Sequence, residues 1–220
     1  MDDPPRDGRS TRWDPHRRER RHHIIEAAIQ AIEEYGPDVL TGQIAEKAGV
    51  PRTHVYRHFD GKPALDLAVS THVAVEISRH IRAAFAEAGP AIGIIASAID
   101  RHLAWVDEHP NLYRFLAQNA YAIKTPQGGP ADAKAAFAAE ITAITAQYMD
   151  ALGIDTEPVE RMIVGVVGLV DATASWWIGR RQPARATVAA ELTAEVWLII
   201  DHAGRQLGAT LDPNTALPRI

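Results

Sequence analysis

Residues 41–59 read TGQIAEKAGVPRTHVYRHF, and the fold of this chain follows from them. Two short helical segments flank Gly49, a residue that permits a tight turn. Pro51 opens the second segment, where the missing N–H of proline is harmless. The apolar positions that we expect to form the core are Ile44, Ala45, Val50, Val55 and Phe59. The polar side chains between them then point outward, so the stretch predicts a helix, a tight turn and a second helix.

Helical spacing continues on both sides of this stretch. Before it, an apolar stripe from Ile24 to Ile32 ends at Gly36-Pro37. After it, residues 62–87 repeat an apolar side chain every four positions. That stripe winds by about half a turn, so we expect this helix to link two domains. Further helices are expected over residues 91–108, 110–123, 131–152, 156–180 and 184–207. Because strand patterns are nearly absent, the chain should be all-α, with about nine helices.

The composition limits the possible functions. The 220 residues carry a net charge of −5, so nucleic-acid contact would have to be local. There is no cysteine, which excludes disulfides and thiolate metal sites and favours the cytoplasm. The most apolar run, Ile163–Val170, is far shorter than the roughly 20 residues of a membrane span. Basic residues gather between Arg9 and His23, either as a solvated tail or as a DNA-contacting arm.

The central stretch resembles the signature of the TetR family. That signature runs Ile-Ala, two polar residues, Ala-Gly-Val, a polar helix start, Tyr, one variable residue, His/Tyr-Phe, and a Lys three residues later. The matching residues here are Ile44-Ala45, Ala48-Gly49-Val50, Tyr56, His58-Phe59 and Lys62. The resemblance covers about residues 20–68 and implies a DNA-binding transcriptional regulator. It departs at Pro63, where an acidic residue is common, and at Leu40, so we expect Thr41 to be the helix cap.

The resemblance also implies roles for individual residues. Those at phosphate-contacting positions are Thr41, Tyr56, His58 and Lys62. Those at base-reading positions are Gln43, Arg52, Thr53, His54 and Arg57. Arginine suits the two acceptors of guanine, so Arg52 and Arg57 are the favoured readers. Two alternatives stay open, namely that Tyr56 is a core aromatic and that His54 is a bystander.

The expected organisation has four parts. Residues 1–19 form a flexible basic arm, 20–66 the helix-turn-helix domain, 67–208 a ligand-binding and dimerisation domain, and 209–220 a tail. The last two helices should pair with their two-fold mates in a four-helix bundle, giving a homodimer on an inverted-repeat operator. For that contact, Gly165 and Gly168 would permit close approach. The apolar stripe for it would be Val188, Leu192, Val196 and Ile199.

The C-terminal half suggests an apolar effector. Its candidate lining residues are Trp105, Tyr113, Phe115, Leu116, Tyr121, Phe137, Ile141, Leu169 and Trp176. Residues 161–181 weakly resemble actinobacterial lipid- and acyl-CoA-sensing regulators. A long-chain acyl-CoA or fatty acid is therefore the expected ligand, with its head group near His102, Arg114 or Arg161. A filled core without a chamber is the alternative.

Two other classes of function compete with this interpretation. A helical scaffold protein could use the helix-turn-helix for a protein partner, but the polar face of residues 51–58 disfavours it. An enzyme is disfavoured because no nucleophile elbow, Gly-rich phosphate loop or HExxH motif is present. We expect no cofactor, no metal site and no membrane partner. A repressor is the preferred form of the regulator.

Overall fold

The computed structural model describes residues 10–122, 130–151 and 159–217. These residues form nine helices and one antiparallel pair of two-residue strands, which confirms the predicted all-α class. The helices are α1 (Ser10–Tyr35), α2 (Thr41–Lys47), α3 (Arg52–His58), α4 (Gly61–Phe85), α5 (Ala91–Glu108), α6 (Pro110–Ala122), α7 (Pro130–Ala151), α8 (Val159–Arg180) and α9 (Arg185–Gln206). The strands are β1 (Gly89–Pro90) and β2 (Ala216–Leu217).

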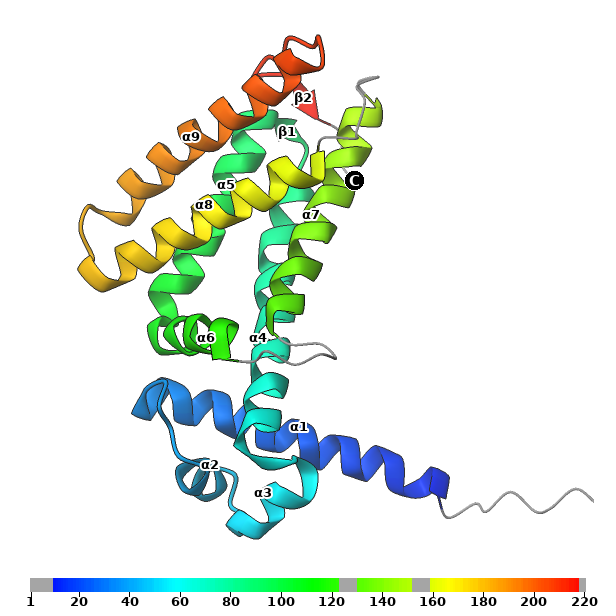
Figure 1. The fold of residues 1–220 in the computed structure, drawn as a ribbon, viewed down its shortest axis with the longest axis vertical. Coiled ribbons are helices and arrows are strands. Elements are labelled where there is room, and N and C mark those ends of the chain that lie inside the picture. The colour runs from blue at the N-terminus through cyan, green and yellow to red at the C-terminus, as the bar shows by residue number, and fades with distance from the viewer. Residues whose placement is uncertain (1–9, 123–129, 152–158, 218–220) are drawn as a thin grey trace, which may run out of the picture.

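The first three helices and the start of α4 form the N-terminal unit (Figure 1). Ile24, Ala28 and Ile32 of α1 are buried against Ile44 of α2 and Val55 of α3. Burial of each such aliphatic side chain stabilises the fold by about 1.5–3 kcal/mol. Because α2 and α3 are only seven residues long each, this packing on α1 holds them in place.

Helix α4 runs from this unit into the upper bundle, which is formed by the rest of α4 and by α5 to α9, as Figure 1 shows. Leu65, Val69 and Val73 are fully buried at its lower end, whereas Ile81 and Ala84 are buried further along. Helix α4 contacts α1 and α6 as well as α5 and α7. The predicted winding stripe therefore does face different neighbours at its two ends.

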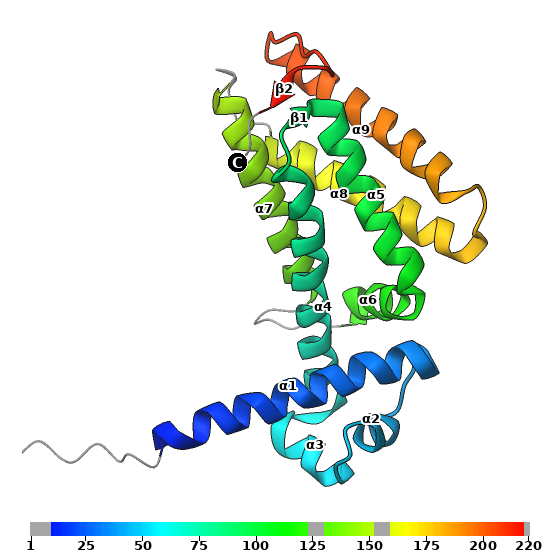
Figure 2. The ribbon, with the colours of Figure 1, turned by 180° about the vertical axis from the view of Figure 1, so that it is seen from behind.

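The upper bundle holds two separate apolar clusters. The larger cluster extends from the N-terminal unit through Leu103, Trp105 and Phe115 to Leu192 on α9. The smaller one joins Ile141 of α7 to Ile163 of α8, with Phe85 and Phe137 packed against it. Seen from behind, α8 runs from beside α7 toward the outer edge, along which α9 lies (Figure 2).

Three details of the structure differ from expectation. Helix α1 already begins at Ser10, inside the segment expected to be a flexible arm. Leu40 rather than Thr41 is the N-cap of α2, so the predicted Thr41 cap is wrong. A leucine side chain cannot accept a hydrogen bond, but the Gln43 Oε1 accepts the Leu40 N–H at 2.8 Å instead. Within the expected tail, residues 216–217 pair with β1.

For α8 and α9, the sequence pattern did not distinguish the face that is buried in the protomer from the face that is exposed. Val188, Leu192 and Val196 are at most 3% exposed inside the protomer, so the stripe assigned to dimerisation is wrong. It packs on α5 instead. Helix α8 is long and apolar enough to span a membrane by length and composition, yet only 22% of its most apolar window is buried. The apolar part of α8 is therefore longer than the Ile163–Val170 run that was considered in the sequence.

Candidate nucleic-acid interface

The turn between α2 and α3 is built from backbone geometry around Gly49. Its φ of +64° lies in the left-handed region that favours glycine. The Gly49 N–H donates to the Glu46 carbonyl, and the Val50 N–H donates to the Ala45 carbonyl, both at 3.0 Å. These two bonds form a Schellman motif that closes α2. The motif sets the direction in which Pro51 starts α3.

Two side chains of α1 hold the ends of the helix-turn-helix. His23 Nε2 lies 3.0 Å from the Ala48 carbonyl at the end of α2. Arg21 donates to the His58 carbonyl at 2.7 Å and stacks 4.2 Å above the ring of Phe59. A cation at a helix C-terminus also complements the helix dipole. Sequence reasoning placed both residues in or beside a basic arm, because only the fold brings them to these carbonyls.

The outer face of α3 is polar and exposed. Arg52 and Tyr56 lie one turn apart, and the Arg52 guanidinium donates to the Tyr56 hydroxyl at 3.1 Å. Tyr56 is 42% exposed, which disfavours the core-aromatic alternative. The guanidinium first, and the Thr41 hydroxyl second, lower the pKa of Tyr56 from its ordinary value. Such a face offers donors to phosphates and to base edges.

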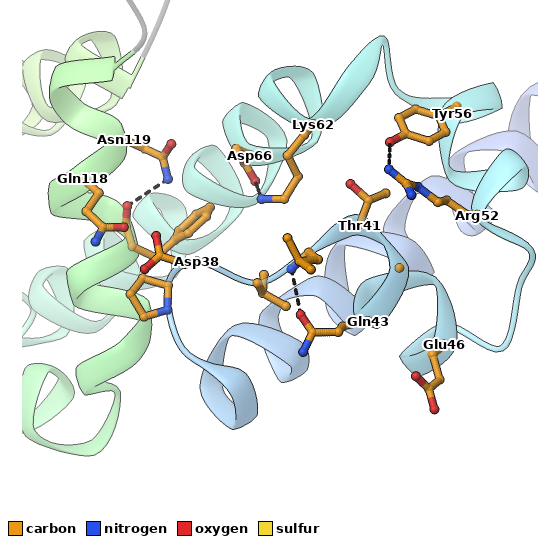
Figure 3. Close-up of a pocket in the computed structure, with 15 residues that line it drawn as sticks. Asp38, Thr41, Gln43, Glu46, Arg52, Tyr56, Lys62, Asp66, Gln118 and Asn119 are labelled. Carbon is orange, nitrogen blue, oxygen red and sulfur yellow. Dashed lines mark hydrogen bonds and ion pairs between the residues drawn. The ribbon is translucent and has the colours of Figure 1, made fainter.

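The other predicted DNA-contacting residues near Arg52 and Tyr56 differ in how exposed they are. Thr53 and Arg57 are exposed on α3, and His54 is half-buried. Thr41 is buried at 6% exposure at the start of α2, where its hydroxyl lies beside that of Tyr56. Gln43 uses its side-chain oxygen to cap α2, which leaves its amide nitrogen directed outward (Figure 3).

His58 sits at the end of α3 in a cationic environment. Its half-buried ring contacts the ring of His54 edge to face, with centroids 6.1 Å apart. Burial lowers the pKa of His58, and the charges of His54, Arg17, Arg20 and Arg21 lower it further. Both effects favour the neutral ring over the protonated one. A phosphate placed beside it would oppose this effect by favouring the protonated form.

Lys62 already has a partner when no DNA is present. Its ammonium lies 2.6 Å from Oδ1 of Asp66, one turn further along α4. Only 14% of the Asp66 side chain is exposed, and burial raises the pKa of its carboxyl although Lys62 opposes this. The pair borders a cavity of about 890 Å³ between α2, α4 and α6. Figure 3 shows that Gln118 and Asn119 of α6 face this cavity from the upper bundle.

A polar contact between Glu33 and His109 joins the N-terminal unit to the helices above it. His109 Nδ1, between α5 and α6, lies 2.7 Å from the Glu33 carboxylate of α1. The Asn111 side chain donates to the Glu33 carbonyl at 2.9 Å. The contact with Glu33 was not predicted from the sequence, because the contacting residues are far apart in the chain. A shift of α6 would act directly on α1 through it.

The predicted effector residues do not share one environment. Trp105, Tyr113 and Phe115 are buried in the larger cluster, and Leu116 and Leu169 pack against it. Ile141 and Phe137 belong to the smaller cluster. Trp176 is 44% exposed on α8, which disfavours its assignment to an inner pocket. The side chain of Tyr121 lies outside the described residues.

Tyr113 connects the bundle helices. Its hydroxyl lies 2.9 Å from both the carbonyl and Oδ1 of Asp171, and 3.1 Å from the Ser175 hydroxyl. Burial, and then the Asp171 carboxylate, raise the pKa of Tyr113. These hydrogen bonds connect α6, which also contacts the N-terminal unit, to α8.

Comparisons with known proteins agree with this architecture. The family model for bacterial regulatory proteins of the tetR family matches residues 24–69, and the tetracyclin repressor-like C-terminal domain matches residues 80–211. An uncharacterized HTH-type transcriptional regulator of Mycobacterium tuberculosis is 31% identical over 174 residues, covering 77% of this chain and 73% of the relative.

Solved structures show the same fold. A tetR-family transcriptional regulator from Streptomyces coelicolor has a TM-score of 0.67 at 22% identity, over 87% of this chain and 86% of its own. The regulator FadR from Bacillus subtilis, solved in complex with stearoyl-CoA, has a TM-score of 0.59 at 17% identity, over 80% of this chain and 96% of its own.

Proposed function

Because the chain belongs to the TetR family of bacterial transcriptional regulators, we propose that it binds an inverted-repeat operator as a homodimer and is released by an apolar effector. Its relatives are transcriptional regulators, not enzymes. A repressor that acts in the cytoplasm, where the DNA lies, is the form that we propose.

The exposed α3 face carries the DNA-binding part of this proposal. Arg52 and Arg57 are exposed donors on a helix that a major groove admits. Tyr56 and Lys62 flank them as phosphate-binding groups, with the Thr41 and His58 positions beside them. The polar character of this face also disfavours a scaffold protein, since protein-binding helices usually present apolar anchors.

The DNA proposal is tested by selecting operators from a random duplex library and measuring affinity against salt concentration. Arg52→Ala should reduce discrimination at one base pair by about 1–3 kcal/mol. Lys62→Ala should weaken all sequences alike and lower the salt slope by about 0.9. Gln147→Ala, on an exposed part of α7, serves as the control. Unchanged operator affinity in both Arg52→Ala and Lys62→Ala would contradict this placement of the interface.

The exposed face of α8 and α9 supports the homodimer. Val164, Trp176 and Leu198 are exposed by 56%, 44% and 66%. A β-carbon added at Gly165 or Gly168 would meet no atom within 4 Å, so a partner helix could approach closely there. An apolar face of this kind is what an isologous helical contact requires. It also accounts for an apolar α8 without any membrane.

The two apolar clusters support an effector of matching chemistry. Ile77 and Leu116 are only partly buried beside the larger cluster, as Phe85 and Phe137 are beside the smaller one. An acyl chain lying between α5 and α7 would cover these side chains. The stearoyl-CoA complex of the Bacillus subtilis neighbour offers an example of such a ligand on this fold.

The effector proposal is tested by titrating the protein–operator complex with acyl-CoAs of graded chain length and with small polar metabolites. Longer chains should release DNA at lower concentration, because each buried methylene contributes about 0.8 kcal/mol. Leu169→Ala and Phe137→Ala should weaken this release and leave effector-free operator affinity unchanged. Release by polar compounds alone would contradict an apolar effector while leaving the DNA proposal intact.

A further inference from the structure

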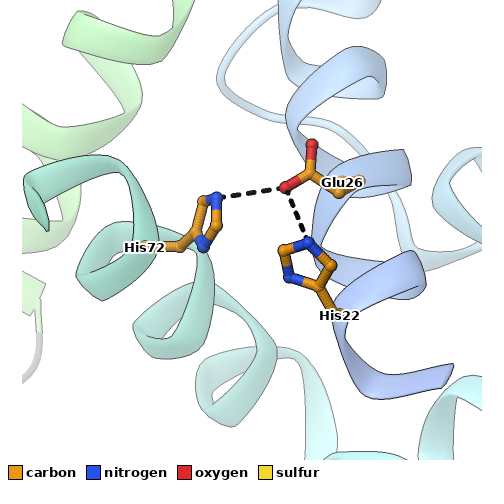
Figure 4. A group of neighbouring side chains, drawn as sticks. All are labelled: His22, Glu26 and His72. Carbon is orange, nitrogen blue, oxygen red and sulfur yellow. Dashed lines mark ion pairs between the residues drawn. The ribbon is translucent and has the colours of Figure 1, made fainter. Parts of the chain in front are cut away.

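We propose that His22, Glu26 and His72 form a binding site for a divalent transition-metal ion, with zinc as the best match. His22 and Glu26 lie one turn apart on α1, and His72 projects toward them from α4 (Figure 4). No metal site was expected from the sequence, because His72 lies far along the chain from the other two residues. The fold brings the three ligand atoms within 4.8 Å of one another.

Two of the three separations between ligand atoms are near those around a tetrahedral ion. His72 Nε2 lies 3.0 Å from Oε1 of Glu26, and His22 Nε2 lies 3.6 Å from the same oxygen. Zinc bonds of about 2.0–2.2 Å place neighbouring tetrahedral ligands about 3.3–3.6 Å apart. The His22 side chain is 61% exposed and so is free to rotate toward the ion.

The ligand types favour zinc over harder ions. Two imidazoles and one carboxylate are a common zinc set, whereas magnesium and calcium prefer oxygen ligands. Three protein ligands leave the fourth position to water or to another group. The imidazole rings of His22 and His72, 5.3 Å apart between centroids, converge without stacking.

The charges around the three residues are of both signs, with Arg20 and Arg21 before His22 on α1 and carboxylates further along both helices. Further along α1 and α4, a hollow of about 430 Å³ is lined by Glu33, Glu34 and Glu76, of which Glu33 is paired with His109 and Glu34 with Lys47. Glu76 follows His72 by one turn of α4. Glu76 therefore adds a negative charge near the three proposed ligands, which favours a cation there.

Such an ion would join the N-terminal unit to the linking helix. Helix α1 holds α2 and α3 through His23 and Arg21. His72 lies between the residues matched by the two family models, on the helix that begins beside Lys62. A metal here would fix the angle between α1 and α4, so operator affinity should respond to the ion independently of the effector.

The test uses the full-length, tag-free protein, stripped with a chelator and titrated with zinc in competition with a metal-binding dye. We expect one tight site per chain, together with a higher melting temperature. His22→Ala, Glu26→Gln and His72→Ala should each weaken binding about tenfold or more and remove the thermal shift. Because His22 is exposed, its variant tests the site without disturbing the core.

Two exposed histidines on the same helices provide matched controls, His16→Ala on α1 and His80→Ala on α4. These variants should keep the site and the thermal shift. Equal loss in the controls, or an unchanged affinity in His22→Ala and His72→Ala, would overturn the proposal. Operator binding by the metal-free protein is measured separately, so a failed metal site and a failed DNA proposal give different results.

Discussion

Lys62 and Asp66 form an ion pair of 2.6 Å on the first two turns of α4, at the boundary between the DNA-binding unit and the bundle. The proposed phosphate-binding ammonium is therefore shared with a carboxylate that is largely buried. DNA has to compete with Asp66 for Lys62, and any shift of α4 moves both groups together.

Replacing Asp66 with asparagine should strengthen operator binding. The substitution frees Lys62 and removes a negative charge near the DNA, so we expect about 0.5–1 kcal/mol, or two- to fivefold. Fluorescence anisotropy at fixed salt measures the change. In Lys62→Ala protein the same substitution should have less effect, because the two residues act as a pair. Weaker binding by Asp66→Asn would mean that the pair holds Lys62 in its DNA-binding position.

His58 should take up a proton when DNA binds below pH 7. Its pKa is lowered by burial and by neighbouring cations, and a phosphate would raise it again. Operator affinity should therefore increase as the pH falls from 7 toward 5.5. Calorimetry in two buffers of different ionisation enthalpy measures the uptake. His58→Asn should abolish it, and an undiminished uptake in that variant would assign the proton to another group.

The lowered pKa of His58 also makes stability depend on pH, but stability should fall at acidic pH whereas operator affinity should rise. The unfolded chain protonates this histidine near the ordinary histidine pKa of 6.5, before the folded protein does. The free energy of unfolding of the DNA-free protein should therefore fall as the pH drops below that value. His58→Asn should reduce this dependence, as urea denaturation at several pH values would show.

Leu198→Asp and Val164→Asp should dissociate the dimer and leave the protomer folded. Both side chains are more than half exposed, so a charge there disrupts only a contact with a partner. Leu192→Asp should instead unfold the protomer, because Leu192 is 1% exposed. Sedimentation velocity with circular dichroism separates the two outcomes. A stable dimer in both surface variants would place the interface elsewhere.

Two glycines of the helix-turn-helix should respond in opposite directions to alanine. A β-carbon would meet no atom within 4 Å at Gly42 or at Gly49. Gly49 has φ +64°, so Gly49→Ala should destabilise by about 1–2 kcal/mol. Gly42 lies within α2, where alanine is better, so Gly42→Ala should stabilise by about 0.5–1 kcal/mol. Urea denaturation decides this, and a stabilised Gly49→Ala protein would show that the turn tolerates a side chain.

Local sequence patterns were enough to predict the helices and the helix-turn-helix. The expected helices end within a few residues of those observed from α2 onward, because glycine, proline and apolar spacing act over one or two turns. The polar face of α3 was also predictable, since Arg52, Thr53 and Tyr56 belong to one short helix. The signals for these features act over one or two turns, although packing on α1 is what stabilises the two short helices.

Which helix faces meet became clear only from the folded chain. An apolar stripe shows that α9 has a buried side, but it does not say whether Leu192 packs on its own protomer or on a partner. Likewise, Trp176 is as apolar on the surface as it would be in a pocket. The contacts of Arg21 with Phe59, of Glu33 with His109 and of Glu26 with His72 depend on how α1 packs against α3, α6 and α4. Such crossings result from packing between residues far apart in the chain, where no local spacing rule applies.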